Sequence, residues 1–193
     1  MKIAIIDYGA GNVQSVKYAF DRLGYDAIIT DDYKKIKLAD KVIFPGVGEA
    51  SSAMHALKLK KLDKLIPELK QPVLGICLGM QMMCKFSEEG NTEGMGIFDL
   101  MVKKFPKGLK VPQIGWNQIE TLKTSLFKGI REKEYMYLVH SYYVENNKDA
   151  IALSTYGLKY ATAIQKNNFY GVQFHPEKSS RAGELLLRNF LKM

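Results

Sequence analysis

Cys77 stands at the centre of the segment Gly75-Ile76-Cys77-Leu78-Gly79, after an apolar run and before a predicted helix. A nucleophile flanked by small residues at a strand-to-helix turn is typical of the nucleophile elbow, in which glycines permit the sharp turn that exposes the central side chain. The N-terminus of the helix favours a thiolate there, and the Leu78 N–H is free to face an oxyanion. The pattern predicts a catalytic thiol, whereas the alternative is a buried cysteine in a tight turn.

A histidine and a glutamate are separated by one proline near the C-terminus, in His175-Pro176-Glu177. We expect this segment to end a strand in extended form, so that His175 and Glu177 point to the same side. A carboxylate beside a histidine fixes the imidazole tautomer and raises its basicity. Together with Cys77 these residues would form a nucleophile, a base and an orienting group. A surface histidine beside a glutamate by chance is the alternative.

The segment Pro45-Gly46-Val47-Gly48 follows another apolar run. Its two glycines give a backbone that can turn an N–H toward a ligand. We therefore expect Val47 and Gly48, with Leu78, to supply an oxyanion hole. A plain strand-to-helix turn would have the same composition.

Other residues of reactive type have simpler interpretations. Cys84 is expected in the core, His55 on the surface, and His140 in a structural or supporting role. The segment Gly9–Gln14 has two of the three glycines of a dinucleotide-binding loop, with Gln14 at the third position. It is interpreted as a tight turn at the mouth of a site rather than a nucleotide site. No metal site and no cofactor are expected.

The elements that must position these residues alternate between strand and helix in the first half of the chain. Apolar, β-branched runs predict strands at Lys2–Asp7, Tyr25–Ile29, Lys41–Phe44 and Pro72–Ile76. Helices are expected near 13–23, from Glu49 to about Leu69 with Pro67 near its end, and over Leu78–Phe86. This alternation predicts an α/β fold: a doubly wound, mostly parallel sheet with helices on both faces.

The second half of the chain is predicted to be rich in strands and to end in a helix whose apolar stripe includes Leu186 and Phe190. The predicted strands are Ile97–Phe105, Gln118–Thr121, Tyr135–Val144, Ala150–Ser154, Ala161–Gln165 and Phe169–Phe174. No linker or repeat divides the chain, so residues 1–193 are expected to form one domain.

Composition excludes several classes of protein. With 47% hydrophobic and 25% charged residues, the chain has the composition of a folded, soluble domain. The formal net charge of +8 comes mostly from lysines spread along the chain, which argues against a nucleic-acid partner. No apolar run approaches the ~20 residues of a membrane span, and no leader sequence is apparent, so a cytoplasmic protein is expected.

These motifs resemble those of the class I glutamine amidotransferases, in GICLGMQ around Cys77 and YGVQFHPEKS over 170–179. The resemblance extends over the whole chain. PGVGEA (45–50), VPQIGWN (111–117) and YLVHSYY (137–143) resemble most closely the glutaminase subunits of imidazole glycerol phosphate synthases. Gln113 is a departure, since many of those subunits carry histidine there. The family fold adds a β-rich layer to the doubly wound sheet.

The resemblance implies hydrolysis of glutamine to glutamate and ammonia. Cys77, His175 and Glu177 would be the catalytic triad, and the N–H groups of Leu78 and the Gly46–Gly48 loop would hold the oxyanion. The residues implied to bind the substrate are Gly46, Gln81, Glu89, Ser141 and Tyr142.

The resemblance also implies a partner, because ammonia must reach an acceptor directly. In the family this partner is a cyclase subunit with a (β/α)₈ barrel fold, which forms a heterodimer with the glutaminase in histidine biosynthesis. The residues that match family positions facing it are Asn12, Trp116, Tyr137 and Lys178. Three alternatives remain open from the sequence: an amidotransferase subunit serving another acceptor, such as amidine formation on a surface sugar; a noncatalytic α/β module; and a stand-alone thiol hydrolase.

Overall fold

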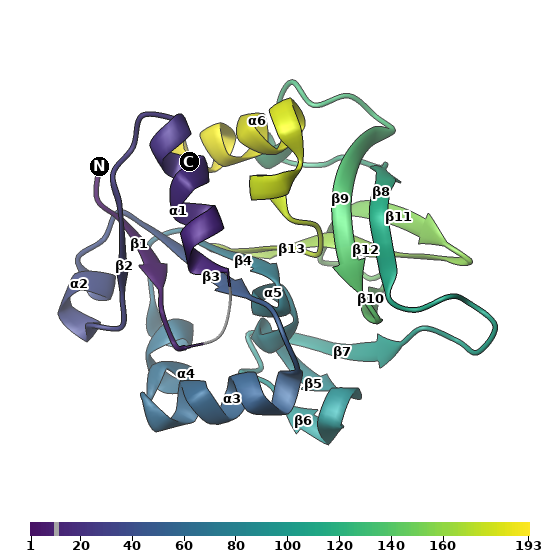
Figure 1. Cartoon of the computed structure of the whole chain (residues 1–193), viewed down its shortest axis with the longest axis horizontal. Helices are drawn as coiled ribbons and strands as arrows, with labels where there is room; N and C mark the ends of the chain where they lie inside the picture. Colours follow the sequence, from purple (N-terminus) through teal and green to yellow (C-terminus); the bar gives the residue numbers. More distant parts are fainter. Residues whose placement is uncertain (10–11) are drawn as a thin grey trace.

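A computed structural model describes residues 1–9 and 12–193, and a large mixed sheet runs through its centre (Figure 1). The strands are β1 (Ile3–Ile6), β2 (Ala27–Thr30), β3 (Lys41–Gly46), β4 (Val73–Cys77), β5 (Cys84–Ser87), β6 (Thr92–Glu93), β7 (Phe98–Lys104), β8 (Gln113–Ile119), β9 (Glu134–His140), β10 (Tyr142–Glu145), β11 (Ala150–Tyr156), β12 (Leu158–Lys166) and β13 (Phe169–Val172). The order in the large sheet is β2-β1-β3-β4-β13-β12-β10-β7-β5-β6, with β11 paired to β12.

The half of the sheet that carries the predicted motifs is parallel. Strands β2, β1, β3, β4 and β13 pair in parallel, whereas β12 pairs antiparallel with β13, β11 and β10. Strands β8 and β9 form a separate antiparallel ribbon, seen upright beside the large sheet in Figure 1. The predicted fold class, a doubly wound sheet with an additional β-rich layer, is confirmed.

Helices cover both faces of the sheet. They are α1 (Val13–Arg22), α2 (Tyr33–Lys37), α3 (Ala50–Leu59), α4 (Leu62–Leu65), α5 (Leu78–Met83) and α6 (Ser180–Leu191), with 3₁₀ turns η1 (Ile66–Glu68), η2 (Glu89–Asn91), η3 (Ser125–Phe127) and η4 (Pro176–Lys178). Because side chains alternate along a strand, Ile3 and Ile5 of β1 face a core shared with α1, α6 and the β8–β9 ribbon. Ala4 and Ile6 face the core shared with α2, α3, α4 and α5.

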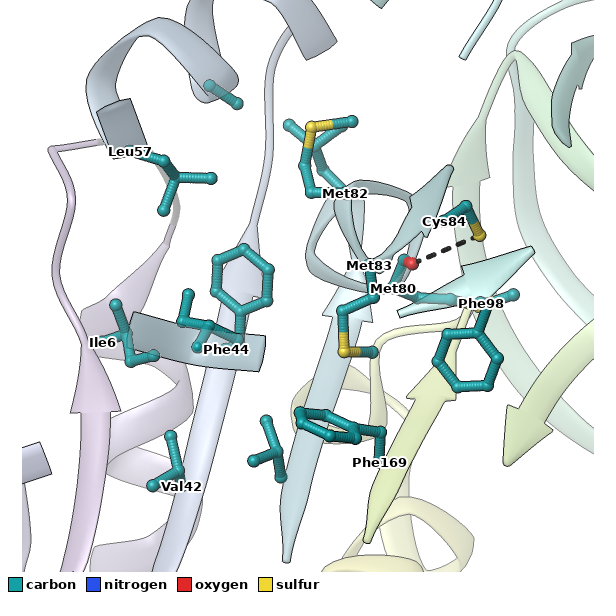
Figure 2. Close-up of a cluster of buried hydrophobic side chains, with 14 of the residues drawn as sticks. Ile6, Val42, Phe44, Leu57, Met80, Met82, Met83, Cys84, Phe98 and Phe169 are labelled. Atoms are coloured by element: carbon teal, nitrogen blue, oxygen red, sulfur yellow. Dashed lines mark hydrogen bonds between the residues drawn. The ribbon is translucent and has the colours of Figure 1, made fainter. Parts of the chain in front are cut away.

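Figure 2 shows part of this second core, where three methionines of α5 meet the sheet. Met80, Met82 and Met83 are all fully buried. They pack in one cluster with Phe44 and Phe169, from the strands on either side of β4. The helix that begins at the predicted nucleophile is therefore fixed by packing along its whole length.

The strand predicted over Lys41–Phe44 is longer than expected. Pro45-Gly46 was expected to end it, but β3 continues to Gly46 and pairs with β4 as far as Gly46 and Cys77. Proline is tolerated there because the pairing of β1 with β3 ends at Ile43. Pro45 therefore lies where one side of the strand needs no backbone hydrogen bond.

Two helix predictions are also wrong in part. The segment 49–69 is helical but breaks at Lys61, whose φ of 53° is left-handed and separates α3 from α4. The helix predicted over Leu78–Phe86 ends at Met83, and Cys84–Ser87 forms β5 instead. Strand β5 pairs with β6 and β7, so tertiary pairing overrides the local helical pattern.

Two strand predictions need correction too. The strand expected at Gln118–Thr121 is β8, which begins earlier, at Gln113, and ends at Ile119. The strand expected over Tyr135–Val144 divides at Ser141 into β9, in the ribbon, and β10, in the large sheet. The Gly9–Gln14 turn lies partly outside the described residues. No helix in the described part of the chain is long and apolar enough to span a membrane.

Candidate active site

The predicted motifs meet at the carboxyl ends of three adjacent strands. Strand β4 lies between β3 and β13. In register, Gly46 of β3 lies opposite Cys77, and Val172 of β13 lies opposite Ile76. The loop after β3 and the segment after β13 therefore flank Cys77, although they are far apart in sequence. This is the edge where parallel α/β sheets gather their ligands.

Cys77 occupies the sharp turn that the elbow pattern predicts. Its φ of 54° and ψ of −112° are strained for a residue with a side chain. Cys77 precedes α5 as its N-cap residue, but its side chain makes no capping hydrogen bond to the helix. Leu78 is the first residue of α5, so its N–H has no intrahelical partner. Gly75 and Gly79 allow the turn, since a Cβ on Gly75 would lie 2.9 Å from the Met80 nitrogen.

Gly79→Ala is expected to disturb the elbow. A Cβ on Gly79 would lie 1.9 Å from the Phe44 carbonyl oxygen, so α5 would have to move away from β3. We expect a loss of about 1–3 kcal/mol in the free energy of unfolding, together with a loss of the catalytic activity that depends on Cys77. Chemical denaturation and an activity assay measure the two effects.

Gly96→Ala is the matched control. Its φ of +67° is left-handed, but a Cβ there meets nothing within 4 Å. It should cost about 1–2 kcal/mol and leave the activity of the site unchanged. Full stability and activity of Gly79→Ala would contradict the close approach of α5 to β3.

His175 and Glu177 are paired, but not through an extended segment. The distance from His175 Nδ1 to Glu177 Oε1 is 2.8 Å, and both side chains are almost fully buried. The expectation that Pro176 keeps the segment extended is wrong, because Pro176–Lys178 forms the 3₁₀ turn η4. Proline suits the first position of such a turn, where its missing N–H has no partner to lose. One tight turn then brings Glu177 back to the imidazole.

The charge state of His175 follows from its neighbours. Burial of the ring lowers its pKa, but the Cys77 and Glu177 side chains outweigh burial and raise the pKa of His175 above its ordinary value. At neutral pH the imidazole is therefore predominantly protonated. It can give a proton to a leaving group beside Cys77.

Backbone contacts with β9 hold His175 in place. The His175 N–H donates to the Tyr137 carbonyl at 2.9 Å, and the Tyr137 N–H donates to Ser179 Oγ at 2.9 Å. The Ser179 hydroxyl in turn donates to the His175 carbonyl at 2.6 Å. This closed set of bonds fastens η4 to the ribbon.

A cavity of about 280 Å³ opens above Cys77. Its size approaches the ~300 Å³ at which small-molecule pockets begin. Its lining contains most of the predicted site residues: Val47, Gly48, Cys77, Leu78, Gln81, Glu89, Ser141, Tyr142, His175 and Lys178. Pro112, Val139 and His140, which the sequence analysis did not assign to the site, complete the lining. Gly46 does not line it, because its Cα faces inward, where a Cβ would lie 2.6 Å from the Tyr8 hydroxyl.

A buried network forms the wall behind this cavity. The pKa of His140 falls to about 4 because burial disfavours its charge, so the ring is neutral. Its Nδ1–H donates to the Tyr142 carbonyl at 2.7 Å. The Tyr160 hydroxyl lies 3.3 Å from His140 Nε2 and donates to Gln113 Oε1 at 3.1 Å. Both His140 and Gln113 therefore support the wall.

Glu89 brings a carboxylate to the cavity from η2. Its Oε2 accepts from the Ala50 N–H at the start of α3 at 3.0 Å. Burial raises the pKa of Glu89 above its ordinary value. Glu49, at the same helix end, accepts from Ser51 and Ser52, and its pKa falls to about 2. Of these two carboxylates, Glu89 lines the cavity and Glu49 does not. The Glu89 carboxylate can therefore bind a cationic group there.

The residues predicted to face a partner lie outside the cavity, except Lys178. Trp116 and Tyr137 are directly opposed across β8 and β9, with ring centroids 6.0 Å apart, and Trp116 is 52% exposed. Asn12 is exposed and caps α1 through Ser15. Lys178 is exposed at the end of η4. Their positions leave Trp116, Lys178 and Asn12 accessible from outside.

Sequence reasoning also missed a buried residue that contacts the nucleophile. Gln173 is fully buried and contacts both Cys77 and Gln81. The period-two rule applied to His175 and Glu177 would have found it, because Gln173 precedes His175 by two positions at the end of a strand. Among residues 1–9 and 12–193, no group of three or more metal-ligating side chains is present.

Comparisons with known proteins identify the family of the chain. The family model "Glutamine amidotransferase class-I" matches residues 4–193. The chain is 54% identical to the imidazole glycerol phosphate synthase subunit HisH of Bacteroides fragilis, with both chains covered completely. It is 51% identical to the HisH subunit of Haemophilus influenzae, covering 100% of this chain and 98% of that one.

A crystal structure of a glutamine amidotransferase shares the fold with a TM-score of 0.77 at 16% identity, covering 98% of this chain and 97% of the other. At that identity the likeness concerns the fold alone. The full-length sequence matches carry the assignment further. The chain belongs to the class I glutamine amidotransferase family.

Proposed function

We propose that this chain is the glutaminase subunit of an imidazole glycerol phosphate synthase, as its relatives are named. The observation that carries the proposal is the meeting of Cys77 with the His175–Glu177 pair at the ends of β4 and β13, beside a cavity lined by Gln81 and Glu89. The cavity holds a cysteine, an acid–base histidine and a carboxylate for a substrate ammonium. These are the groups that hydrolysis of the amide of glutamine requires.

The reaction proceeds in two halves. The Cys77 thiolate attacks the carboxamide carbon, and the negative oxygen is held by the Leu78 N–H and by an N–H of the Val47–Gly48 loop. Protonated His175 gives its proton to the departing ammonia, which leaves a glutamyl thioester. Neutral His175 then takes a proton from water, which attacks the thioester and releases glutamate. Glu177 orients the imidazole throughout.

The remaining substrate contacts follow from charge. Glu89 faces the α-ammonium group of glutamine, and Gln81 and the backbone at Ser141–Tyr142 hold the rest of the molecule. No cofactor takes part. Residues 1–193 act as one domain, in the cytoplasm.

The ammonia passes to a separate cyclase subunit with a (β/α)₈ barrel. Exposed Trp116, with Tyr137, Asn12 and Lys178, forms the docking surface for that subunit. An exposed tryptophan on a rigid ribbon is a common anchor of protein interfaces. Ammonia is protonated in water at neutral pH, so direct transfer keeps it nucleophilic.

The isolated chain is expected to hydrolyse glutamine slowly. Gly48 has a φ of +103° and open space around it, so the peptide before it can rotate and turn an oxyanion donor in or out. One oxyanion donor is worth about 10²–10³ in rate, so a partner that biases this peptide would accelerate hydrolysis by about that factor. Glutamate release is measured with and without the cyclase subunit and its acceptor. Full activity of the isolated chain, unchanged by the partner, would contradict both the switch and the synthase assignment.

Trp116→Ala separates docking from catalysis in the same assay. It should leave the slow basal hydrolysis unchanged and weaken binding of the cyclase subunit about tenfold or more. Leu38→Ala is the control, because Leu38 is 70% exposed and follows α2. It should alter neither quantity.

A further inference from the structure

Gln173 has both ends of its amide engaged in the site, although its side chain is wholly inaccessible to solvent. Its Nε2 donates to Cys77 Sγ at 3.7 Å, and its Oε1 accepts from Gln81 Nε2 at 2.9 Å. A buried amide costs free energy unless its polar atoms are bonded. Here the bonds go to the nucleophile on one side and to a cavity residue on the other.

The partners of Gln81 fix which way both amides point. Gln81 Nε2 also donates to the Tyr142 carbonyl, at 3.2 Å, so both of its N–H groups are used. Gln81 Oε1 is then the acceptor that remains for the cavity, which Gln81 lines. Because Gln173 must accept from Gln81, its own N–H groups are turned toward Cys77.

We propose that Gln173 is a positioning residue for the nucleophile, which holds the sulfur of Cys77 by an N–H hydrogen bond and sets the orientation of Gln81. The proposal rests on the proposed glutaminase function. An N–H donated to a thiolate is a charge-assisted bond and is stronger than the same bond to a thiol. Gln173 therefore favours the reactive form of Cys77 from the buried side.

Three other groups act on the same sulfur. The Cys77 thiol donates to the Val139 carbonyl of β9 at 3.8 Å. The His175 imidazolium faces Cys77 from η4, and the buried Tyr8 hydroxyl lies near it from the end of β1. His175 exchanges its proton during the reaction, whereas the Gln173 amide does not titrate. Gln173 thus remains a hydrogen-bond donor at every stage of the cycle.

The test follows the alkylation of Cys77 by iodoacetamide as a function of pH, a reaction that needs no glutamine. Gln173→Met keeps the size of the side chain and removes the donor. It should move the pH of half-maximal alkylation upward by about one to two units. Gln173→Glu also lacks the amide N–H and brings a carboxylate beside the sulfur, so the shift should be at least as large. Cys84 is fully buried, and mass spectrometry locates the label.

Steady-state kinetics give a second readout. Gln173→Met should lower kcat for glutamine about ten- to a hundredfold through the lost bond to sulfur, and raise KM because Gln81 is no longer oriented. Gln165→Met and Gln165→Glu are the matched controls, since the Gln165 amide donates to the Tyr170 hydroxyl on the next strand. They should change neither the alkylation profile nor kcat. Thermal unfolding of every variant shows that it is folded.

The outcomes separate the two proposals. A folded Gln173→Met protein with the wild-type alkylation profile would overturn the positioning role and leave glutamine hydrolysis intact. Values of kcat and KM for Gln173→Met that equal those of the Gln165 variants would overturn it as well. A wild-type chain that alkylates normally but hydrolyses no glutamine, with or without a cyclase subunit, would instead overturn the proposed function.

Discussion

Cys77→Ala is expected to abolish glutamine hydrolysis while leaving the fold intact. The thiolate forms the covalent bond to substrate, and no other described cysteine reaches the cavity, because Cys84 is buried in the core beneath α5. Alanine is tolerated in packing because the cavity side of Cys77 is open. The measurement is glutamate release with the cyclase subunit present, beside a binding assay for that subunit. Retention of even a tenth of the wild-type rate would show that Cys77 is not the nucleophile.

Cys84→Ala is the matched control for the loss of a thiol. Figure 2 shows Cys84 among buried side chains, with its Sγ directed to the Met80 carbonyl at a distance of 3.7 Å. Burial raises the pKa of the Cys84 thiol to about 12, so it stays protonated and unreactive. Its replacement should cost about 1 kcal/mol of stability and leave hydrolysis unchanged.

The elbow could be predicted because its signal is local. Gly75, Cys77 and Gly79 are close in sequence, and the strain they imply is present in the φ of Cys77. The meeting of Cys77 with His175 could not be predicted in the same way. It depends on β13, close to the C-terminus, pairing beside β4, which is a long-range choice of the sheet. The residue types indicated that Cys77 could act with the His175–Glu177 pair, but not which strands bring them together.

The errors at secondary-structure boundaries have a common cause. Leu78–Phe86 is apolar apart from Gln81 and Lys85, and a short, mostly apolar run does not distinguish helix from strand. In the structure α5 is buried on all sides, and β5 lies between β7 and the edge strand β6. Tyr135–Val144 is likewise a plausible single strand, but Ser141 divides it between two sheets. That division places Ser141 and Tyr142 at the cavity wall.

The His175–Glu177 contact was predicted for a reason that the structure replaces. Period-two alternation placed the two side chains on one face, whereas a 3₁₀ turn brings them together. The same alternation, extended backward, indicates Gln173. Sequence reasoning thus found the His175–Glu177 pair and missed Gln173, whose amide connects Cys77 with Gln81.

His175→Ala is expected to reduce turnover far more than Glu177→Gln. The imidazole moves a proton in both half-reactions, so its loss should lower kcat by about 10⁴–10⁶-fold. Glu177 only orients and stabilises the imidazolium, so the fold loss of kcat in Glu177→Gln should be about ten to a hundred times smaller than in His175→Ala. Steady-state kinetics with the cyclase subunit present measure both, and equal or reversed losses would contradict the assigned roles.

Glu177→Gln is the informative member of the pair, because it preserves shape. Oε1 of the new amide can still accept from His175 Nδ1–H, and its NH₂ takes the place of Glu177 Oε2, which has no hydrogen-bond partner among the described residues. What is lost is the negative charge that helps to raise the pKa of His175. The imidazolium should then lose its proton at lower pH, so the alkaline limb of the plot of kcat/KM against pH should shift to lower pH. Glu184→Gln, on the exposed side of α6, is the control and should leave the profile in place. An alkaline limb that stays fixed in Glu177→Gln would show that the carboxylate does not hold the charge on His175.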